Sequence, residues 1–312
     1  MRLYRRICGL LLAGLLAFAS YPATGCSSES ASPETPGRKD DNKKDDDGII
    51  RILAIGNSFS QDAIEQYLYE LFDAAGQKVI IGNLYIGGCS LERHYNNSVS
   101  DKAEYEYRKV VDGVKTNTKK TKLIDGLLDE PWDYISLQQA SGKSGLYDTY
   151  NPYLKSLVAY VRRNAPKRDF KLVWHQTWAY ASDSNHGEFP NYGNDQMKMY
   201  EAIVSATKNA LKDNKFDLLV PSGTAIQNAR TSYLGDSFNR DGYHLNVYYG
   251  RYTAACTWFE SISGKNVVGN SYAPENVDEG QKEVAQNAAH EAVRHPYKVT
   301  IMKDFQTAPS GN

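Results

Sequence analysis

The sequence RILAIGNSFS, residues 51–60, determines how the rest of the chain is interpreted. Its apolar first half predicts a buried β-strand, and Gly56 ends that strand before a small polar tip, residues 57–60. A pattern typical of one amphipathic helix follows over residues 64–75. A strand, a glycine turn and a helix present a residue at the carboxyl end of a strand in an open α/β sheet. Ser58 is therefore either a nucleophile or part of a helix cap, and this stretch alone leaves both readings open.

Further apolar runs alternate with helical patterns along the chain. The predicted strands cover residues 49–55, 78–86, 132–137, 170–174 and 216–220. Short apolar strands alternating with helices indicate a parallel sheet covered on both faces. Residues 91–121 fit this alternation poorly, and we interpret them as an insertion with a strand near Tyr105 and Tyr107 and a turn at Asp112-Gly113. We expect one domain, residues 49–300, folded as a three-layer α/β/α sandwich with a five-stranded parallel sheet, and a tail at 301–312.

The first residues have the features of a targeting segment. Three arginines precede an apolar run at residues 7–19 that is too short for a convincing membrane span. Ala23-Thr24-Gly25-Cys26 resembles a bacterial lipobox, so we expect a lipoprotein signal peptide over 1–25 and lipidation of Cys26, with ordinary secretion as the alternative. Residues 26–48 are almost free of apolar side chains and predict a disordered tether. The sequence thus predicts an exported protein, anchored by lipid at the periplasmic face or the cell surface.

Composition excludes several classes of partner. With 41% hydrophobic and 23% charged residues, the chain is typical of soluble globular proteins. Loss of the three arginines in the leader would change the formal net charge from −1 to −4, and no basic patch indicates nucleic-acid binding. Only Cys89 and Cys256 lie in the domain; their spacing does not suit zinc, and we expect no bridge between them. No metal site or cofactor motif is present, and we expect a monomer.

Polar residues follow the predicted strands where a site would form. Ser58, Gly88, the pair Gln138-Gln139 and the pair His175-Gln176 come after successive strands, and Asp241 and His244 follow in a later loop. Carboxyl ends of parallel strands share one edge of a sheet, so these residues can converge. A serine needs a base to remove its proton, and a histidine is the better base when a carboxylate orients it. The alternative is that Asp-Gly-Tyr-His is only a turn with a capping aspartate.

These motifs, in this order, resemble the SGNH (GDSL-like) hydrolase superfamily. More closely, IGNSFS, GGCSL, LQQAS and DGYHL are similar to the DUF4886 branch. The resemblance implies a flavodoxin-like sheet and ester hydrolysis, usually deacetylation of carbohydrate. It implies that Ser58 is the nucleophile, that His244 is the general base and then acid, and that Asp241 orients His244. The backbone amides of Ser58 and Gly88 would then donate to the oxyanion of the tetrahedral intermediate.

The chain departs from the family pattern at two places. Asn57 stands where the first block usually has aspartate, and the Gly-x-Asn-Asp block that usually supplies a third oxyanion donor is absent. Gln138 or Gln139 would have to serve instead. We prefer Gln139 because it lies further past the strand, although a slip of one residue reverses the choice.

Three residues are predicted to contact substrate, and the function has two rivals. Asn57 belongs to the nucleophile turn, while His175 and Trp178 form either a sugar-stacking wall or packing beneath a long loop. The leading hypothesis is an exported serine esterase that deacetylates a carbohydrate through Ser58, Asp241 and His244. The alternatives are a lipid or aryl esterase of the same fold and a non-catalytic glycan-binding lipoprotein.

Overall fold

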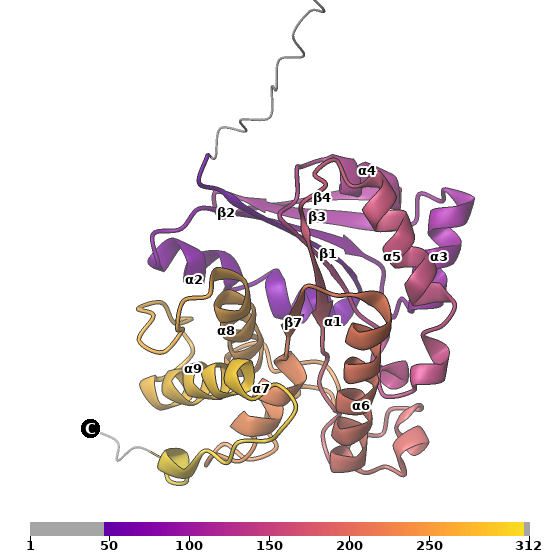
Figure 1. The fold of residues 1–312 in the computed structure, drawn as a ribbon. Coiled ribbons are helices and arrows are strands. Elements are labelled where there is room, and N and C mark those ends of the chain that lie inside the picture. The colour runs from indigo at the N-terminus through magenta and orange to yellow at the C-terminus, as the bar shows by residue number, and fades with distance from the viewer. Residues whose placement is uncertain (1–46, 309–312) are drawn as a thin grey trace, which may run out of the picture. The chain divides into compact units, whose positions relative to one another are not determined.

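The computed structural model describes residues 47–308. The predicted signal peptide, the lipidation of Cys26 and all but the last two residues of the tether lie outside the described residues. Helices cover both faces of a central sheet, which confirms the predicted three-layer α/β/α class (Figure 1).

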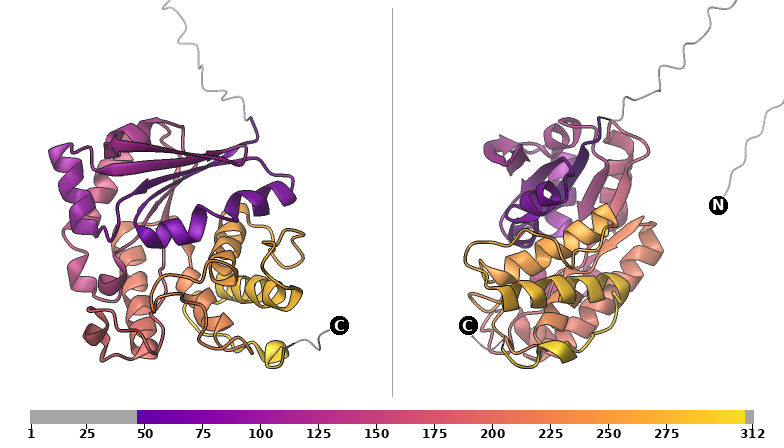
Figure 2. Two further views of the ribbon diagram at one scale, coloured as in Figure 1. Left: turned by 180° about the vertical axis from the view of Figure 1, so that it is seen from behind. Right: turned by 90° about the vertical axis from the view of Figure 1, so that its left-hand side faces the viewer.

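The central sheet has seven strands rather than the five predicted, in the order β4-β3-β2-β1-β5-β6-β7. The strands are β1 Ile50–Gly56, β2 Val79–Tyr85, β3 Tyr105–Val111, β4 Val114–Thr121, β5 Tyr134–Leu137, β6 Lys171–His175 and β7 Leu218–Val220. The five predicted strands are present as β1, β2, β5, β6 and β7. Within this set, every pair of neighbouring strands is parallel. The two extra strands form an antiparallel hairpin beside β2, inside the segment interpreted as an insertion (Figure 2).

Nine α-helices occur in the described part of the chain. They are α1 Ser58–Ile64, α2 Leu68–Ala74, α3 Leu91–Ser100, α4 Leu123–Leu128, α5 Tyr153–Asn164, α6 Gln196–Asn214, α7 Ser222–Ala229, α8 Tyr249–Ser263 and α9 Glu279–Arg294. Helices α1, α2, α7, α8 and α9 pack on one face of the sheet, and α3, α4 and α5 on the other. Helix α6 contributes to the apolar clusters on both faces.

The structure corrects one helix prediction and adds a helix that the sequence did not indicate. The single helix expected over 64–75 is split, because Tyr67 adopts the left-handed conformation with φ of 69° between α1 and α2. A non-glycine residue rarely adopts this conformation, so the apolar spacing gave no sign of the break. Helix α3, capped by Ser90, occupies a segment that we had not predicted to be helical.

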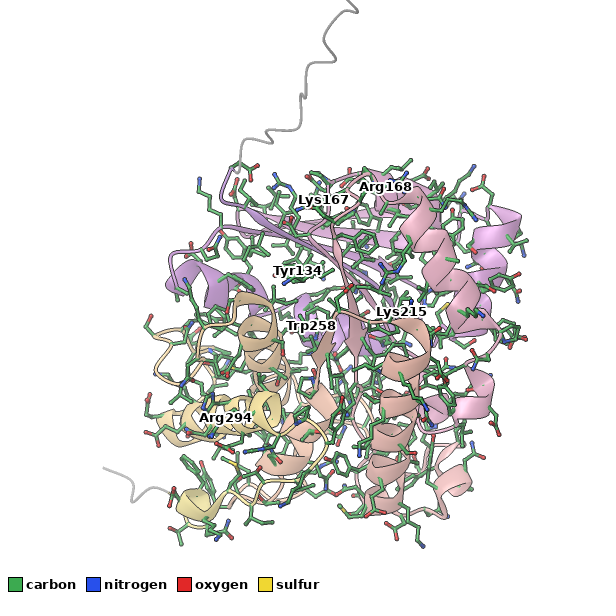
Figure 3. The ribbon with its side chains drawn as sticks, viewed as in Figure 1. Tyr134, Lys167, Arg168, Lys215, Trp258 and Arg294 are labelled. Atoms are coloured by element: carbon green, nitrogen blue, oxygen red, sulfur yellow. The ribbon has the colours of Figure 1, made fainter. Side chains whose placement is uncertain are left out.

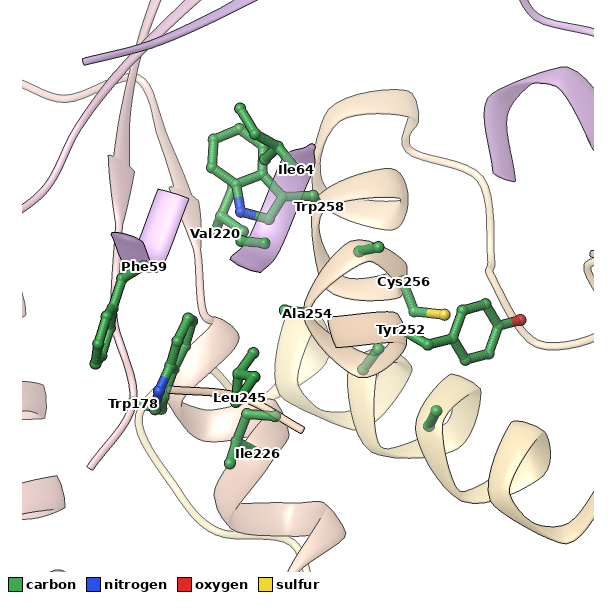
Figure 4. Close-up of a cluster of buried hydrophobic side chains, with 14 of the residues drawn as sticks. Phe59, Ile64, Trp178, Val220, Ile226, Leu245, Tyr252, Ala254, Cys256 and Trp258 are labelled. Carbon is green, nitrogen blue, oxygen red and sulfur yellow. The ribbon is translucent and has the colours of Figure 1, made fainter. Parts of the chain in front are cut away.

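The apolar interior holds large aromatic side chains. Phe59 stacks on Trp178 with ring centroids 4.2 Å apart, beside Leu245 and Ile226 (Figure 4). Trp258 also lies in the interior, whereas the charged side chains of residues 168, 215 and 294 are exposed. Figure 3 labels all four residues. Cys89 and Cys256 are buried, and each is a free thiol.

The described part of the predicted tail, residues 301–308, contacts the domain. Met302 is buried, its N–H donates to the hydroxyl of Thr231 at 2.9 Å, and the N–H of Thr300 donates to Asn228 at 2.7 Å. Residues 300–302 therefore contact the end of α7 and the residues that follow it. Within residues 47–308, no helix combines the length and apolar character needed to span a membrane.

Candidate active site

The turn after β1 is fixed by its own polar side chains. Gly56 is required there because a Cβ would lie 2.4 Å from the hydroxyl of Ser60. Asn57 caps α1 by accepting from the N–H of Phe59 at 2.9 Å, and its Nδ2 donates to the carbonyl of Cys89 at 2.9 Å. Ser58 is thus the first residue of α1 and only partly buried, while Asn57 joins its turn to the turn after β2.

Gly88 and Ser58 carry backbone donors that are not used elsewhere. Gly88 adopts φ of 62°, a conformation that glycine enters without steric cost. Among residues 47–308, the N–H groups of Ser58 and Gly88 have no hydrogen-bond acceptor. Two unused donors on adjoining turns can bind an oxygen on which negative charge develops.

Asp241 and His244 form a compact turn around Gly242, which has φ of 86°. Oδ2 of Asp241 lies 2.7 Å from Nδ1 of His244, and Oδ1 accepts from the backbone N–H of Tyr243 and His244 at 3.2 and 2.7 Å. Burial raises the pKa of the Asp241 carboxyl, but these hydrogen bonds outweigh it and hold the pKa below its ordinary value. The carboxylate fixes the proton on Nδ1, which leaves Nε2 as the basic nitrogen.

Neighbouring elements hold this turn in place. The indole N–H of Trp178 donates to the carbonyl of Tyr243 at 2.8 Å, and the N–H of Ala181 donates to the carbonyl of Gly242 at 2.8 Å. The amide of Asn239 donates to the carbonyl of Tyr243 at 3.0 Å. The loop after β6 therefore supports the segment that carries His244.

A cleft of about 300 Å³ brings the predicted nucleophile, base and oxyanion donors together. Its wall consists of Asn57, Ser58, Tyr85, Gly87, Gly88, Ala140, Ser141, His186, Glu188, Tyr243 and His244. Ser58, Gly88 and His244 come from three distant parts of the sequence, and all three open on this one space. Asp241 stands behind His244.

Neither glutamine lines the cleft, and this corrects the prediction for a third oxyanion donor. Oε1 of Gln139 accepts from the N–H of Leu91 and Ala140, and its Nε2 donates to Thr149. Its amide is thus fully committed to holding loops together. Gln138, buried behind Asn57, donates to Oδ1 of Asn57 at 2.9 Å.

His175 and Trp178 are interior residues, so of the two alternatives the structure favours packing beneath the long loop over a sugar-stacking wall. His175 is 1% exposed; its Nδ1 lies 2.8 Å from Oε1 of Gln138 and its Nε2 lies 3.1 Å from the hydroxyl of Ser222. Burial lowers the pKa of His175 to about 3, so the ring is neutral. Trp178 is fully buried against Phe59. Of the three predicted substrate contacts, only Asn57 reaches the cleft, and its side chain is already engaged.

The sequence did not indicate three residues that line the cleft with Ser58: Tyr85, His186 and Glu188. His186 packs 4.7 Å from the rings of both Tyr180 and Tyr243, and its Nδ1 accepts from the N–H of Glu188. Both His186 and Glu188 lie in the loop between β6 and α6, where no periodic pattern indicated a role. Tyr85, the last residue of β2, belongs to an apolar run that indicates a strand and gives no sign of a role in the cleft.

The chain belongs to the DUF4886 family, described as a domain of unknown function, whose model matches residues 51–292. A crystal structure of a DUF4886 family protein from Bacteroides uniformis ATCC 8492 is 54% identical, with a TM-score of 0.81. That similarity covers 82% of this chain and 99% of the other. Membership of DUF4886 confirms the family predicted from IGNSFS and the accompanying motifs.

More distant structures are similar at lower scores. A protein proposed to be an SGNH hydrolase, from Slackia heliotrinireducens, is 19% identical, with a TM-score of 0.46 over 68% of this chain and 98% of that one. An acetylxylan esterase from Geobacillus stearothermophilus is 12% identical, with a TM-score of 0.45 over 73% and 97%. A search of curated proteins found no match. The case for an activity therefore depends on the cleft itself.

Proposed function

We propose that this chain is an exported serine esterase that removes acetyl groups from a carbohydrate. The observation that carries the proposal is the convergence of Ser58, the Asp241-oriented ring of His244 and the unused N–H groups of Ser58 and Gly88 on one cleft. In this cleft, a carboxylate fixes the tautomer of a histidine, and that histidine shares the cleft with a serine and two free amide donors. A module that only binds a ligand has no need of this arrangement.

The chemistry follows from these positions. The hydroxyl oxygen of Ser58 attacks the ester carbonyl while Nε2 of His244 takes its proton. The N–H groups of Ser58 and Gly88 stabilise the oxyanion, each worth roughly 2.7–4 kcal/mol in comparable sites. His244 then returns the proton to the leaving alcohol, which leaves an acyl group on Ser58. Water, activated by the same nitrogen, releases the acid and restores the serine.

The lining of the cleft favours a small acyl group on a neutral sugar. Ala140 carries the one aliphatic side chain among the lining residues, so the cleft offers no aliphatic stretch for a long acyl chain and a lipid esterase fits less well. Among the lining residues, Glu188 is the one carboxylate, and none is a lysine or arginine. Tyr85 and Tyr243 offer rings with polar edges, which suit sugar hydroxyls and faces.

The proposal places the enzyme outside the cytoplasm, tethered to a membrane through lipid on Cys26. Growth with labelled palmitate should label the chain, and Cys26→Ala should abolish the label. Incorporation that is equal in both chains would contradict the lipid anchor at this residue.

Hydrolysis of 4-nitrophenyl acetate by the purified chain and by Ser58→Ala tests the activity. We expect the variant to lose about 10³-fold or more of kcat, because the nucleophile acts as a unit with its base. Release of acetate from acetylated neutral oligosaccharides would then identify the natural class of substrate. Equal rates from both proteins on every ester would contradict the esterase and favour a glycan-binding protein.

A further inference from the structure

Asp62 is a fully buried carboxylate on the helix that begins with Ser58. It is 0% exposed and lies four residues beyond Ser58, so the two side chains share one face of α1. The mechanism proposed above gives Asp62 no part. A carboxylate so completely removed from water needs charged or hydrogen-bonding partners.

The partners of Asp62 flank the segment that carries the base. Its Oδ2 accepts from Nη1 of Arg240 at 3.0 Å and from the backbone N–H of Leu245 at 2.9 Å. Arg240 immediately precedes Asp241, and Leu245 immediately follows His244. The other oxygen lies 2.6 Å from Nη2 of Arg251, on α8.

Arg240 also connects the two ends of the turn directly. The N–H of Arg240 donates to the carbonyl of His244 at 2.9 Å, and its guanidinium donates to the carbonyl of Leu245. Leu245 is fully buried in the apolar cluster beside Trp178 (Figure 4). One carboxylate on the nucleophile helix thus holds both ends of the Asp-x-x-His turn.

We infer that Asp62 is a positioning residue that sets His244 relative to Ser58. The inference depends on the proposed function, since it assigns a role within that site. Small displacements of a base from its nucleophile lower the rate of proton transfer without changing how substrate binds. Loss of Asp62 should therefore lower kcat and leave KM nearly unchanged.

Glu65 provides a matched control on the same segment. Its side chain is 3% exposed and pairs with Arg108, at 3.2 Å, and with Lys115. Its Oε1 also accepts from Nδ2 of Asn83 at 2.7 Å. These partners lie in β2, β3 and β4, so Glu65→Gln disturbs a buried ion pair without touching the turn that carries His244.

The test compares the full-length parent chain with Asp62→Asn, Glu65→Gln and Arg240→Gln. Each is assayed with 4-nitrophenyl acetate well below its melting temperature. Ring ¹⁵N resonances of His244 are recorded on histidine-labelled protein and assigned by their loss in His244→Gln. Arg240→Gln keeps the contacts of Asp62 with Leu245 and Arg251, so it serves if Asp62→Asn does not fold.

We expect Asp62→Asn to lose at least about tenfold in kcat with KM within about threefold, and Arg240→Gln to lose less. In both variants, the ¹⁵N chemical shifts of His244 should move from those of the Nδ1–H tautomer towards the average of the Nδ1–H and Nε2–H tautomers. In Glu65→Gln, the shifts should match those of the parent. A His244 signal and a kcat equal to those of Glu65→Gln would overturn the inference. If the parent hydrolyses no ester, the proposed function fails, and the tautomer comparison alone still decides the role of Asp62.

Discussion

Within residues 47–308, His244 and His175 each lie near a serine close to the same edge of the sheet, and they differ in what surrounds them. His244 hydrogen-bonds Asp241 through Nδ1 and shares an open cleft with Ser58. His175 lies 3.1 Å from the hydroxyl of Ser222, but both side chains are buried.

The partners of each imidazole explain the difference. Gln138 donates to Asn57, so its Oε1 must accept from His175, and Nε2 of His175 then accepts from Ser222. Every polar atom of that ring is satisfied, and no proton needs to move. At His244 the carboxylate satisfies one nitrogen, and the ring lines the same cleft as Ser58. Residue type alone does not define a catalytic pair; an unsatisfied nitrogen beside an accessible hydroxyl does.

The largest expected contrast is in turnover. Asp241→Asn should lower kcat by roughly 10³–10⁴-fold, because an amide no longer fixes the catalytic tautomer. His175→Gln should stay within about threefold of the parent, since a glutamine can donate to Gln138 and accept from Ser222. Steady-state kinetics on 4-nitrophenyl acetate measures both. A larger loss in His175→Gln than in Asp241→Asn would reverse the assignment of the two pairs.

Substitutions should affect the free energy of unfolding in the opposite order: more in the buried network around His175 than in the cleft. Gln138→Leu leaves the N–H of His175 buried without an acceptor and should destabilise the fold by about 1–3 kcal/mol. Ser58→Ala removes a partly exposed hydroxyl and should change the free energy of unfolding by less than about 0.5 kcal/mol. Urea denaturation gives both values. Equal losses would mean that the cleft contributes to folding as much as the buried network does.

The same residues show how much of the fold and of the site could be predicted from the sequence. Apolar runs and turn residues were enough to predict the five parallel strands and to place Ser58, Gly88, Asp241 and His244 near one another. They could not distinguish Gln139 from Gln138, because both follow β5 and only three-dimensional partners decide where an amide points. The same limit applied to His175, which follows a strand as an active-site residue would.

The break at Tyr67 and the wall formed by Glu188 were missed for a different reason. A positive φ at a tyrosine is imposed by the packing of α1 and α2, and no local propensity predicts it. His186 and Glu188 lie on a long loop whose course is set by contacts with the turn at Tyr243.

The stability of the fold should depend on pH through the buried ring of His175. Because burial lowers the pKa of His175 from an ordinary 6.5 to about 3, the unfolded chain binds a proton that the folded chain does not. Stability should therefore fall as pH drops from about 6.5 to about 3, by up to about 1.4 kcal/mol per pH unit from this group.

His175→Gln should remove that part of the slope. His94, whose pKa burial also lowers to about 3, would keep its own share in the variant. Denaturation midpoints measured at several pH values between 4 and 7 test this, with the parent as control. An unchanged slope in His175→Gln would show that the buried ring is not the source.

The smallest effect is expected on the cleft wall. Glu188→Lys should raise kcat/KM for an acetylated uronic-acid oligosaccharide relative to a neutral one, by a few-fold, because charges near the surface interact weakly through water. Glu188→Gln should fall between the parent and Glu188→Lys. A preference that does not change across the three proteins would place the sugar elsewhere.

Labelling with a fluorophosphonate tests the central claim most directly, because the reagent reacts with a serine only where a base activates it and a cleft admits it. Peptide mass spectrometry of the labelled chain should find the adduct on Ser58 and none on Ser222, and His244→Gln should abolish it. An adduct on Ser222, or none on a folded chain, would contradict the account.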